Sequence, residues 1–233
     1  MIRRLGLLLV CGAAPFAGAA TAEINGARYV EPTTRYEHGV LGDAVEYGAL
    51  ELSFDNGASK RFTLPHSRVF EDTAPRLIRD PQGNRRVLVV ESSLREGARL
   101  ALYDGRGLFA ATPYVGRPHR WLAPVGAADL DGDGYLELAY IDRPHLAKRL
   151  RVWRLTGKSL DHVADQSGLT NHRIGWDHIP GGIRRCGEVP EMVTATADWS
   201  VIAISTLREG RITTRAIGPY RDPDSLNAAL DCP

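Results

Sequence analysis

Short apolar runs, separated by turns rich in Gly, Asp, Asn and Pro, fill most of the chain after residue 22. We predict strands at residues 49–54, 60–64, 87–91, 99–103, 108–110, 137–141, 150–155, 192–196, 201–205 and 212–217. No stretch has the 3.6-residue periodicity of an amphipathic helix, and the best helical candidate is the short tail at 224–230. The pattern indicates an all-β protein, either a sandwich or a propeller.

Three similar openings along the chain favour the propeller. His66, His119 and His172 are spaced 53 residues apart, and each is followed by a turn-rich loop and then by further strands. A period near 50 residues with about four strands per unit is the signature of a β-propeller blade. We therefore predict one domain at 23–233. Its units lie at 33–65, 66–118, 119–171 and 172–218, with a tail at 219–233. This division gives about four blades, or five if the tail contributes.

The first unit is too short for four strands. We expect it to borrow a strand from residues 28–30 or from residues 212–217. Such a shared blade would close the ring and leave no open sheet edge.

One acidic loop stands out, in the third unit. It carries Asp129, Asp131 and Asp133 at alternate positions, with Glu137 four residues later at the start of an apolar run. Carboxylates this close in one tight loop are stabilised by a cation between them, and calcium suits a flexible set of oxygen ligands. An EF-hand is excluded because its twelfth position needs a Glu, and Tyr140 stands there. The alternative is an Asp/Gly-rich hairpin turn without a metal.

The spacing D-x-D-x-D-G-x-x-[DE]-L leading into a strand resembles the calcium loop of FG-GAP (VCBS-type, integrin-like) β-propeller blades. The resemblance covers this loop and the strand after it, and Glu137 replaces the more usual Asp. It implies one structural calcium ion held by the side chains of Asp129, Asp131, Asp133 and Glu137 and by the carbonyl of Tyr135. The corresponding stretches at 79–84 and 184–188 lack the carboxylate set, so we expect a single ion.

Residues 1–22 are typical of a cleaved signal peptide. Arg3 and Arg4 precede a short apolar stretch that ends in the cleavage-site pattern Ala20-Thr21-Ala22. We expect a periplasmic or secreted protein with no membrane insertion after cleavage. The remaining 211 residues carry 27 basic and 28 acidic side chains. A chain this close to neutral lacks the basic surplus of a nucleic-acid-binding protein.

Two cysteines remain after cleavage, Cys186 and Cys232. In an oxidising compartment we expect an even pair to form a disulfide. The alternative is two free thiols.

Recurring basic residues suggest a ligand site at one mouth of a central channel. His66, His119 and His172 form either a ring of imidazoles that binds a metal or an anion, or a repeated structural feature of each loop. Four arginines recur beside them and form either a basic collar for an anion or ion pairs with neighbouring acids. These are Arg35, Arg68, Arg120 and Arg173.

No catalytic motif is present: the chain lacks G-x-S-x-G, H-E-x-x-H, a P-loop and G-x-G-x-x-G. We therefore expect a non-enzymatic binding module whose partner is a protein or a glycan. One alternative is a hydrolase that acts at the channel mouth through His66, His119 or His172 with a nearby acid. Another is a structural accessory subunit of an envelope complex.

Overall fold

The computed structural model describes residues 22–232, so all but the last residue of the predicted signal peptide lie outside the described part. Seventeen strands and one helix make up this part of the chain. The elements are β1 (Ile24–Thr33), β2 (Glu46–Phe54), β3 (Ser59–Thr63), β4 (Arg68–Phe70), β5 (Arg76–Arg79), β6 (Arg85–Ser93), β7 (Gly97–Asp104), β8 (Gly107–Ala111), β9 (Leu122–Ala128), β10 (Glu137–Asp142), β11 (Arg149–Thr156), β12 (Ser159–Ser167), β13 (Leu169–Thr170), β14 (Gly182–Arg184), β15 (Glu191–Thr196), β16 (Val201–Arg208), β17 (Arg211–Pro219) and α1 (Pro223–Ala228). The prediction of an all-β protein is confirmed.

Three four-stranded antiparallel meanders follow one another along the chain. They are β5–β8, β9–β12 and β14–β17, and within each meander every strand pairs with the next. A shorter meander, β1–β3, precedes them. The three-residue strand β4 pairs with both β2 and β6, and so joins the first two meanders into one eight-stranded sheet.

In the short meander β1–β3, the strand added to the first sequence unit comes from the N-terminal side. Residues 28–30 lie in β1, which pairs with β2 over its whole length. Residues 212–217 lie in β17 and pair with β16 instead. Of the two strands considered for completing the first unit, the structure therefore uses the N-terminal one.

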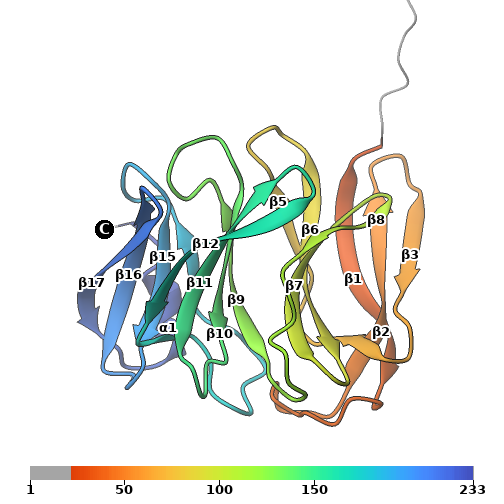
Figure 1. Ribbon diagram of the computed structural model, residues 1–233, viewed down its shortest axis with the longest axis horizontal. Helices are drawn as coiled ribbons and strands as arrows, with labels where there is room; N and C mark the ends of the chain where they lie inside the picture. The colour runs from red at the N-terminus through yellow and green to blue at the C-terminus, as the bar shows by residue number, and fades with distance from the viewer. Residues whose placement is uncertain (1–21, 233) are drawn as a thin grey trace, which may run out of the picture.

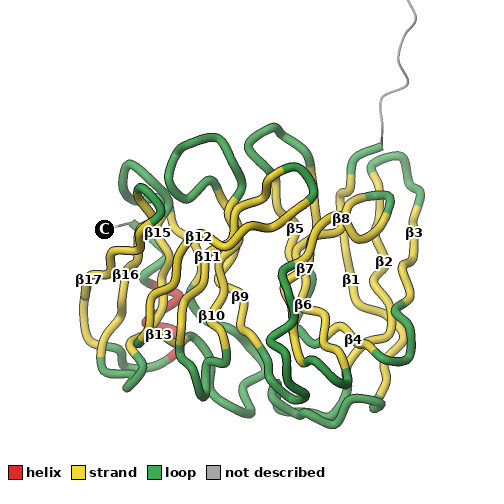
Figure 2. Tube along the Cα trace, viewed as in Figure 1, coloured by secondary structure: helices red, strands yellow, loops and turns green. Residues whose placement is uncertain are grey.

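The meanders stand side by side in chain order, from β1–β3 at one end of the molecule to β17 at the other (Figure 1). None of the three sheets closes on itself. Connecting loops gather at the two ends of the strands (Figure 2). Functional side chains on these loops therefore fall into two groups, one at each end of the sheets.

Alternate residues of the central strands build the layers between the meanders. In β6, Val87 and Val89 pack toward β2, whereas Leu88 and Val90 pack toward β9 and β10. In β10, Leu138 packs into the same layer as Leu88, and Ala139 packs into the layer shared with β15 and β16. Because both faces of these strands are covered, they appear in the sequence as continuous apolar runs. Burying each large apolar side chain contributes roughly 1.5–3 kcal/mol.

The sequence pattern does not predict strand β9, because Pro124 and Gly126 interrupt its apolar run. The glycine has a spatial reason. A Cβ at Gly126 would lie 2.9 Å from the Cδ1 of Ile183 on β14, so the missing side chain allows the next meander to approach.

The tail closes the outer face of the last meander. Helix α1, predicted at 224–230, begins after Asp222, whose side chain accepts a hydrogen bond from the Ser225 amide (2.8 Å) as an N-cap. Leu226 is fully buried against β15 and β16. A disulfide joins Cys186, in the loop before β15, to Cys232 beyond the helix, as the sequence predicts.

Candidate metal loop and the opposite loop cluster

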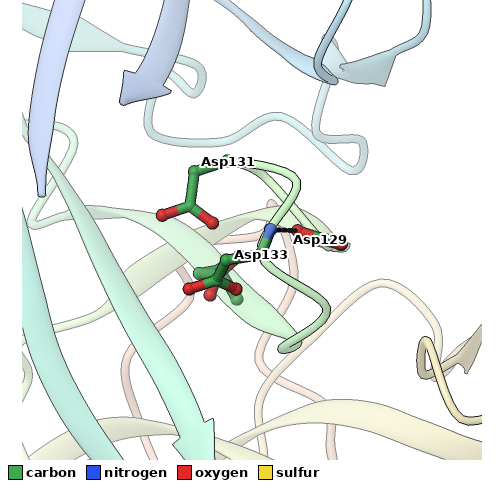
Figure 3. A group of neighbouring side chains, drawn as sticks. Asp129, Asp131 and Asp133 are labelled. Carbon is green, nitrogen blue, oxygen red and sulfur yellow. Dashed lines mark hydrogen bonds between the residues drawn. The ribbon is translucent and has the colours of Figure 1, made fainter. Parts of the chain in front are cut away.

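The β9–β10 hairpin brings the four predicted carboxylates together. Asp129, Asp131, Asp133 and Glu137 each offer an oxygen, and these oxygens all lie within 4.8 Å of one another. Figure 3 shows the three aspartates around one small region at the tip of the hairpin. Leu130 and Leu136 are buried and anchor the two ends of the loop, while its tip remains exposed. Among residues 22–232, this is the one group of acidic, His or Cys side chains close enough to hold a metal ion.

Asp129 organises the turn. Its Oδ1 accepts hydrogen bonds from the amides of Gly132 (2.7 Å) and Asp133 (3.1 Å), and its Oδ2 accepts one from Gly134 (3.0 Å). Gly132 and Gly134 have φ values of 81° and 87°, a left-handed conformation that favours glycine. The turn is therefore organised largely by its own residues, and Gln82 of the β5–β6 loop adds one hydrogen bond to the Gly134 carbonyl (2.8 Å).

Glu137 forms the buried wall of the cluster. It is the first residue of β10 and is fully buried, and its Oε2 accepts a hydrogen bond from the Leu130 amide (2.8 Å). Burial raises the pKa of Glu137 to about 7, although the Leu130 amide and Arg154 oppose the shift. The carboxylate form is thus costly in this position unless further positive charge is supplied.

Arg154 already supplies one positive charge. It lies on β11 directly opposite Glu137 in the register. Its guanidinium contacts Asp131 (2.5 Å), Asp133 (2.8 Å) and Glu137 (2.7 Å). One guanidinium facing four carboxylates leaves an excess of negative charge.

The residues present fit a hard divalent cation. All donors are carboxylate oxygens, the ligand type that calcium prefers. The Oδ1 of Asp131 is buried and has no hydrogen-bond partner within residues 22–232, so one ligand position is unsatisfied. The backbone amide of Tyr135 donates to Asp133 (3.0 Å), and the predicted role of the Tyr135 carbonyl stays a prediction.

The stretches 79–84 and 184–188, which correspond to the acidic loop in the sequence, also form hairpins. Different contacts hold each of them. In the β5–β6 loop, Asp80 accepts hydrogen bonds from Asn84 and pairs with Arg86 (3.1 Å). In the β14–β15 loop, Arg184 pairs with Glu191 (2.7 Å), and the disulfide adds a covalent link. Only the middle hairpin combines several carboxylates.

The three recurring histidines are not brought together as one ring. His66 is exposed beside Leu94 and Arg95, whereas His119 lies exposed against Tyr36. His172 is fully buried, and its Nε2 lies 3.0 Å from the carbonyl of Trp176.

The four recurring arginines differ in what their side chains contact. Arg35 donates to the carbonyl of Arg68 (3.1 Å), and Arg68 pairs with Glu91 (3.0 Å). Arg120 bonds the carbonyl of His119 (2.9 Å), and Arg173 lies over the Trp199 ring at 4.7 Å. Arg35 and Arg68 therefore serve contacts within the protein.

Sequence reasoning missed His38, Glu71 and His145, which have no recurring spacing. His38 Nδ1 lies 2.5 Å from the Oε1 of Glu71, a fully buried carboxylate that also accepts a hydrogen bond from the Ser92 hydroxyl. Here the acid stands between the hydroxyl and the imidazole, so His38 cannot take the Ser92 proton as a general base. The arrangement orients His38 and does not create a nucleophile.

The comparisons leave the family open. No family model matches the chain, and the search against characterised proteins finds no match. Within residues 22–232, no helix is both long and apolar enough to cross a membrane.

Proposed function

We propose that this protein is an exported, non-enzymatic binding module of FG-GAP/VCBS type with one structural calcium loop. The observation that carries the proposal is the convergence of four carboxylates on one point, where Arg154 balances only part of their charge. The disulfide supports an oxidising, exported location.

The succession of meanders supports a small propeller of about four units. Three meanders share one strand order, and β1–β3 forms a shorter first unit. The tail holds a helix and no strand among its described residues, which favours four units over five. The two ends of the row also meet through loops, because the amide of Gly175 donates to the carbonyl of Val40 (3.0 Å).

Asp129, Asp131, Asp133 and Glu137 would hold the calcium, with the Tyr135 carbonyl as the further oxygen that the family resemblance implies. When bound, the ion supplies positive charge that rigidifies the β9–β10 hairpin and takes no part in chemistry. Arg154 competes for the same oxygens, so the calcium affinity reflects the difference between two cations.

The partner is a protein or a glycan. Trp176, Trp199 and Tyr220 form a partly exposed aromatic cluster, with ring centroids 5.4 Å and 4.9 Å apart in succession. Arg173 lies over the Trp199 ring. Flat aromatic faces with a polar edge are typical of binding surfaces, and this cluster supports a glycan partner.

Thermal melting of the mature protein in calcium and in chelator tests the metal loop. At a calcium concentration of about 100 Kd, binding to the folded state contributes ~2.7 kcal/mol. For a chain of this size, this corresponds to an increase in Tm of roughly 5–10 °C. Asp131→Asn should remove the increase, whereas Asp161→Asn, at an exposed position on β12, should retain it. An identical Tm in calcium and chelator for the wild type would reject the calcium loop.

A further inference from the structure

A pocket of about 230 Å³ opens among the loops at the end of the sheets opposite the metal loop. Its polar lining consists of the imidazoles of His38, His119 and His145 and the guanidinium groups of Arg120 and Arg143. Trp121 forms part of its apolar wall. Among the residues that the structure describes, no acidic side chain lines it.

Glu71, which is not part of the lining, fixes the orientation of His38. The buried carboxylate of Glu71 engages its Nδ1 at 2.5 Å, and the Trp121 indole donates to the Glu71 backbone carbonyl (2.9 Å). With Nδ1 engaged by the carboxylate, the Nε2 of His38 stays available to a ligand.

His145 is held by a second chain of hydrogen bonds. The Trp176 carbonyl can only accept, so the Nε2 of His172 carries the proton in this contact (3.0 Å). Burial lowers the pKa of His172 and of His145 to about 4, so both rings are neutral near pH 7. The Nδ1 of His172 is then an acceptor for the Nε2–H of His145 (3.0 Å). The chain fixes one tautomer of His145, with its Nδ1 as a free acceptor.

The backbone around the pocket is strained. His119 and Arg143, both in the lining, have φ values of 52° and 46°. Such a left-handed conformation is unfavourable for non-glycine residues and concentrates at functional sites. Leu146 and Ile174 at the rim are also 65% and 71% exposed, although both are large and apolar.

Among the described residues, the guanidinium groups that line the pocket have no acidic partner within the lining. Arg143 pairs with Asp142 (2.8 Å), which lies outside the lining. In the part of the chain that the structure describes, the guanidinium of Arg120 makes no ion pair and bonds only the carbonyl of His119 (2.9 Å). A free guanidinium beside oriented imidazoles matches the oxygens of a carboxylate or phosphate.

We propose that this pocket binds a small organic anion, a carboxylate or phosphate group on a compact apolar body. Arg120 and His119 contact the anionic group, and Trp121 and Leu146 contact the apolar body. This site is separate from the calcium loop and does not depend on it.

Titration of the mature protein with benzoate and phenyl phosphate, followed by the histidine-ring resonances in NMR spectra, tests the proposal. Benzyl alcohol serves as the neutral probe. We expect saturable shifts of the His38 and His119 signals with at least one anionic probe below about 10 mM, and none with the alcohol. Chelator should leave the binding unchanged.

Arg120→Gln should weaken binding of the anionic probe about tenfold, since it removes a charge-assisted hydrogen bond. Arg117→Gln, in the same loop but outside the lining, is the matched control and should bind as the wild type does. Both positions are on a loop surface, and the melting temperature of each variant checks that it is folded. Absence of saturable shifts with either anion, equal binding of the alcohol, or unchanged affinity in folded Arg120→Gln would overturn the proposal.

Discussion

Arg154 lies among the four clustered carboxylates. Two descriptions of the loop differ in the role that they give to its side chain. In one, the guanidinium is the permanent counter-charge of a metal-free turn. In the other, it balances the acids only until calcium binds. The buried and unpartnered Oδ1 of Asp131 favours the second description, because a complete ion-pair network would satisfy it.

Replacement of Arg154 by Met should lower the calcium-free stability by about 1–3 kcal/mol, because Asp131, Asp133 and Glu137 lose the one positive partner they have within residues 22–232. The increase in Tm on adding calcium should become larger than in the wild type, since the competing cation is gone. Arg106→Met, whose side chain is 87% exposed, is the control and should change neither quantity. A smaller calcium effect in Arg154→Met would contradict competition for the same oxygens.

Glu46 should make the protein less stable at high pH. It is 2% exposed, and burial followed by repulsion from Glu71 raises its pKa to about 9. In the unfolded chain this carboxyl ionises near its ordinary pKa of 4.5, so its contribution to the free energy of unfolding falls as pH rises toward 9.

Glu46→Gln should therefore be more stable than the wild type at pH 8, by an amount on the order of 1–3 kcal/mol, and should differ little at pH 4.5. Urea unfolding at the two pH values measures this difference. Glu96→Gln, at an exposed position, controls for the general loss of a negative charge. Parallel pH profiles for Glu46→Gln and the wild type would rule out the buried, strained carboxylate.

At the scale of elements, the sequence predicts best what is local. Strands β6, β10 and β15 were found because packing on both faces makes their residues apolar. The short strands β4, β13 and β14 have two or three residues each and are defined by their partners, so no pattern of their own reveals them.

The acidic loop and the histidine pocket differ in the same way, because only the acidic loop is local in the sequence. The acidic loop was predictable because its four side chains lie within nine residues, and local turns bring them together. The histidine pocket was not, because His38, His119 and His145 come from three separate loops. Their meeting depends on how the meanders stack, which the spacing of residues does not encode.

The start of β7 supports the loop that carries His119 and Arg120. A Cβ at Gly97 would lie 2.3 Å from the carbonyl oxygen of Arg117 and 2.6 Å from that of Arg120. Gly97 also has a φ of 74°. Close approach of the two backbones therefore requires glycine here.

Gly97→Ala should lower the free energy of unfolding by about 2–4 kcal/mol, because backbone atoms must move apart in addition to the positive-φ strain. Gly116→Ala is the matched control: its φ is 93°, and nothing lies near the added Cβ. It should show only the smaller backbone cost. Equal costs in chemical denaturation for the two variants would contradict the close contact.

For the whole molecule, helix α1 covers the outer face of the last meander. The Cys186–Cys232 disulfide, with a sequence separation of 46, keeps the tail and its helix on the last meander. Because the linked segment is long, the chain-entropy model assigns the bond about 3–4 kcal/mol of stability.

The double variant Cys186→Ser/Cys232→Ser should unfold at a lower temperature and lose up to ~4 kcal/mol. Its tail should be cleaved first in limited proteolysis, since Leu226 then remains as the main buried anchor of α1. The calcium response should persist, because the acidic loop lies on another meander. Cleavage of the wild-type and variant tails at equal rates would show that the disulfide does not hold the helix in place.

Isothermal titration of calcium into chelator-treated mature protein tests the central proposal most directly. We predict saturable binding of one ion per chain, abolished in Asp131→Asn and retained in Asp161→Asn. Absence of binding by the wild type, or unchanged binding by folded Asp131→Asn, would show that the four converging carboxylates do not form a calcium site.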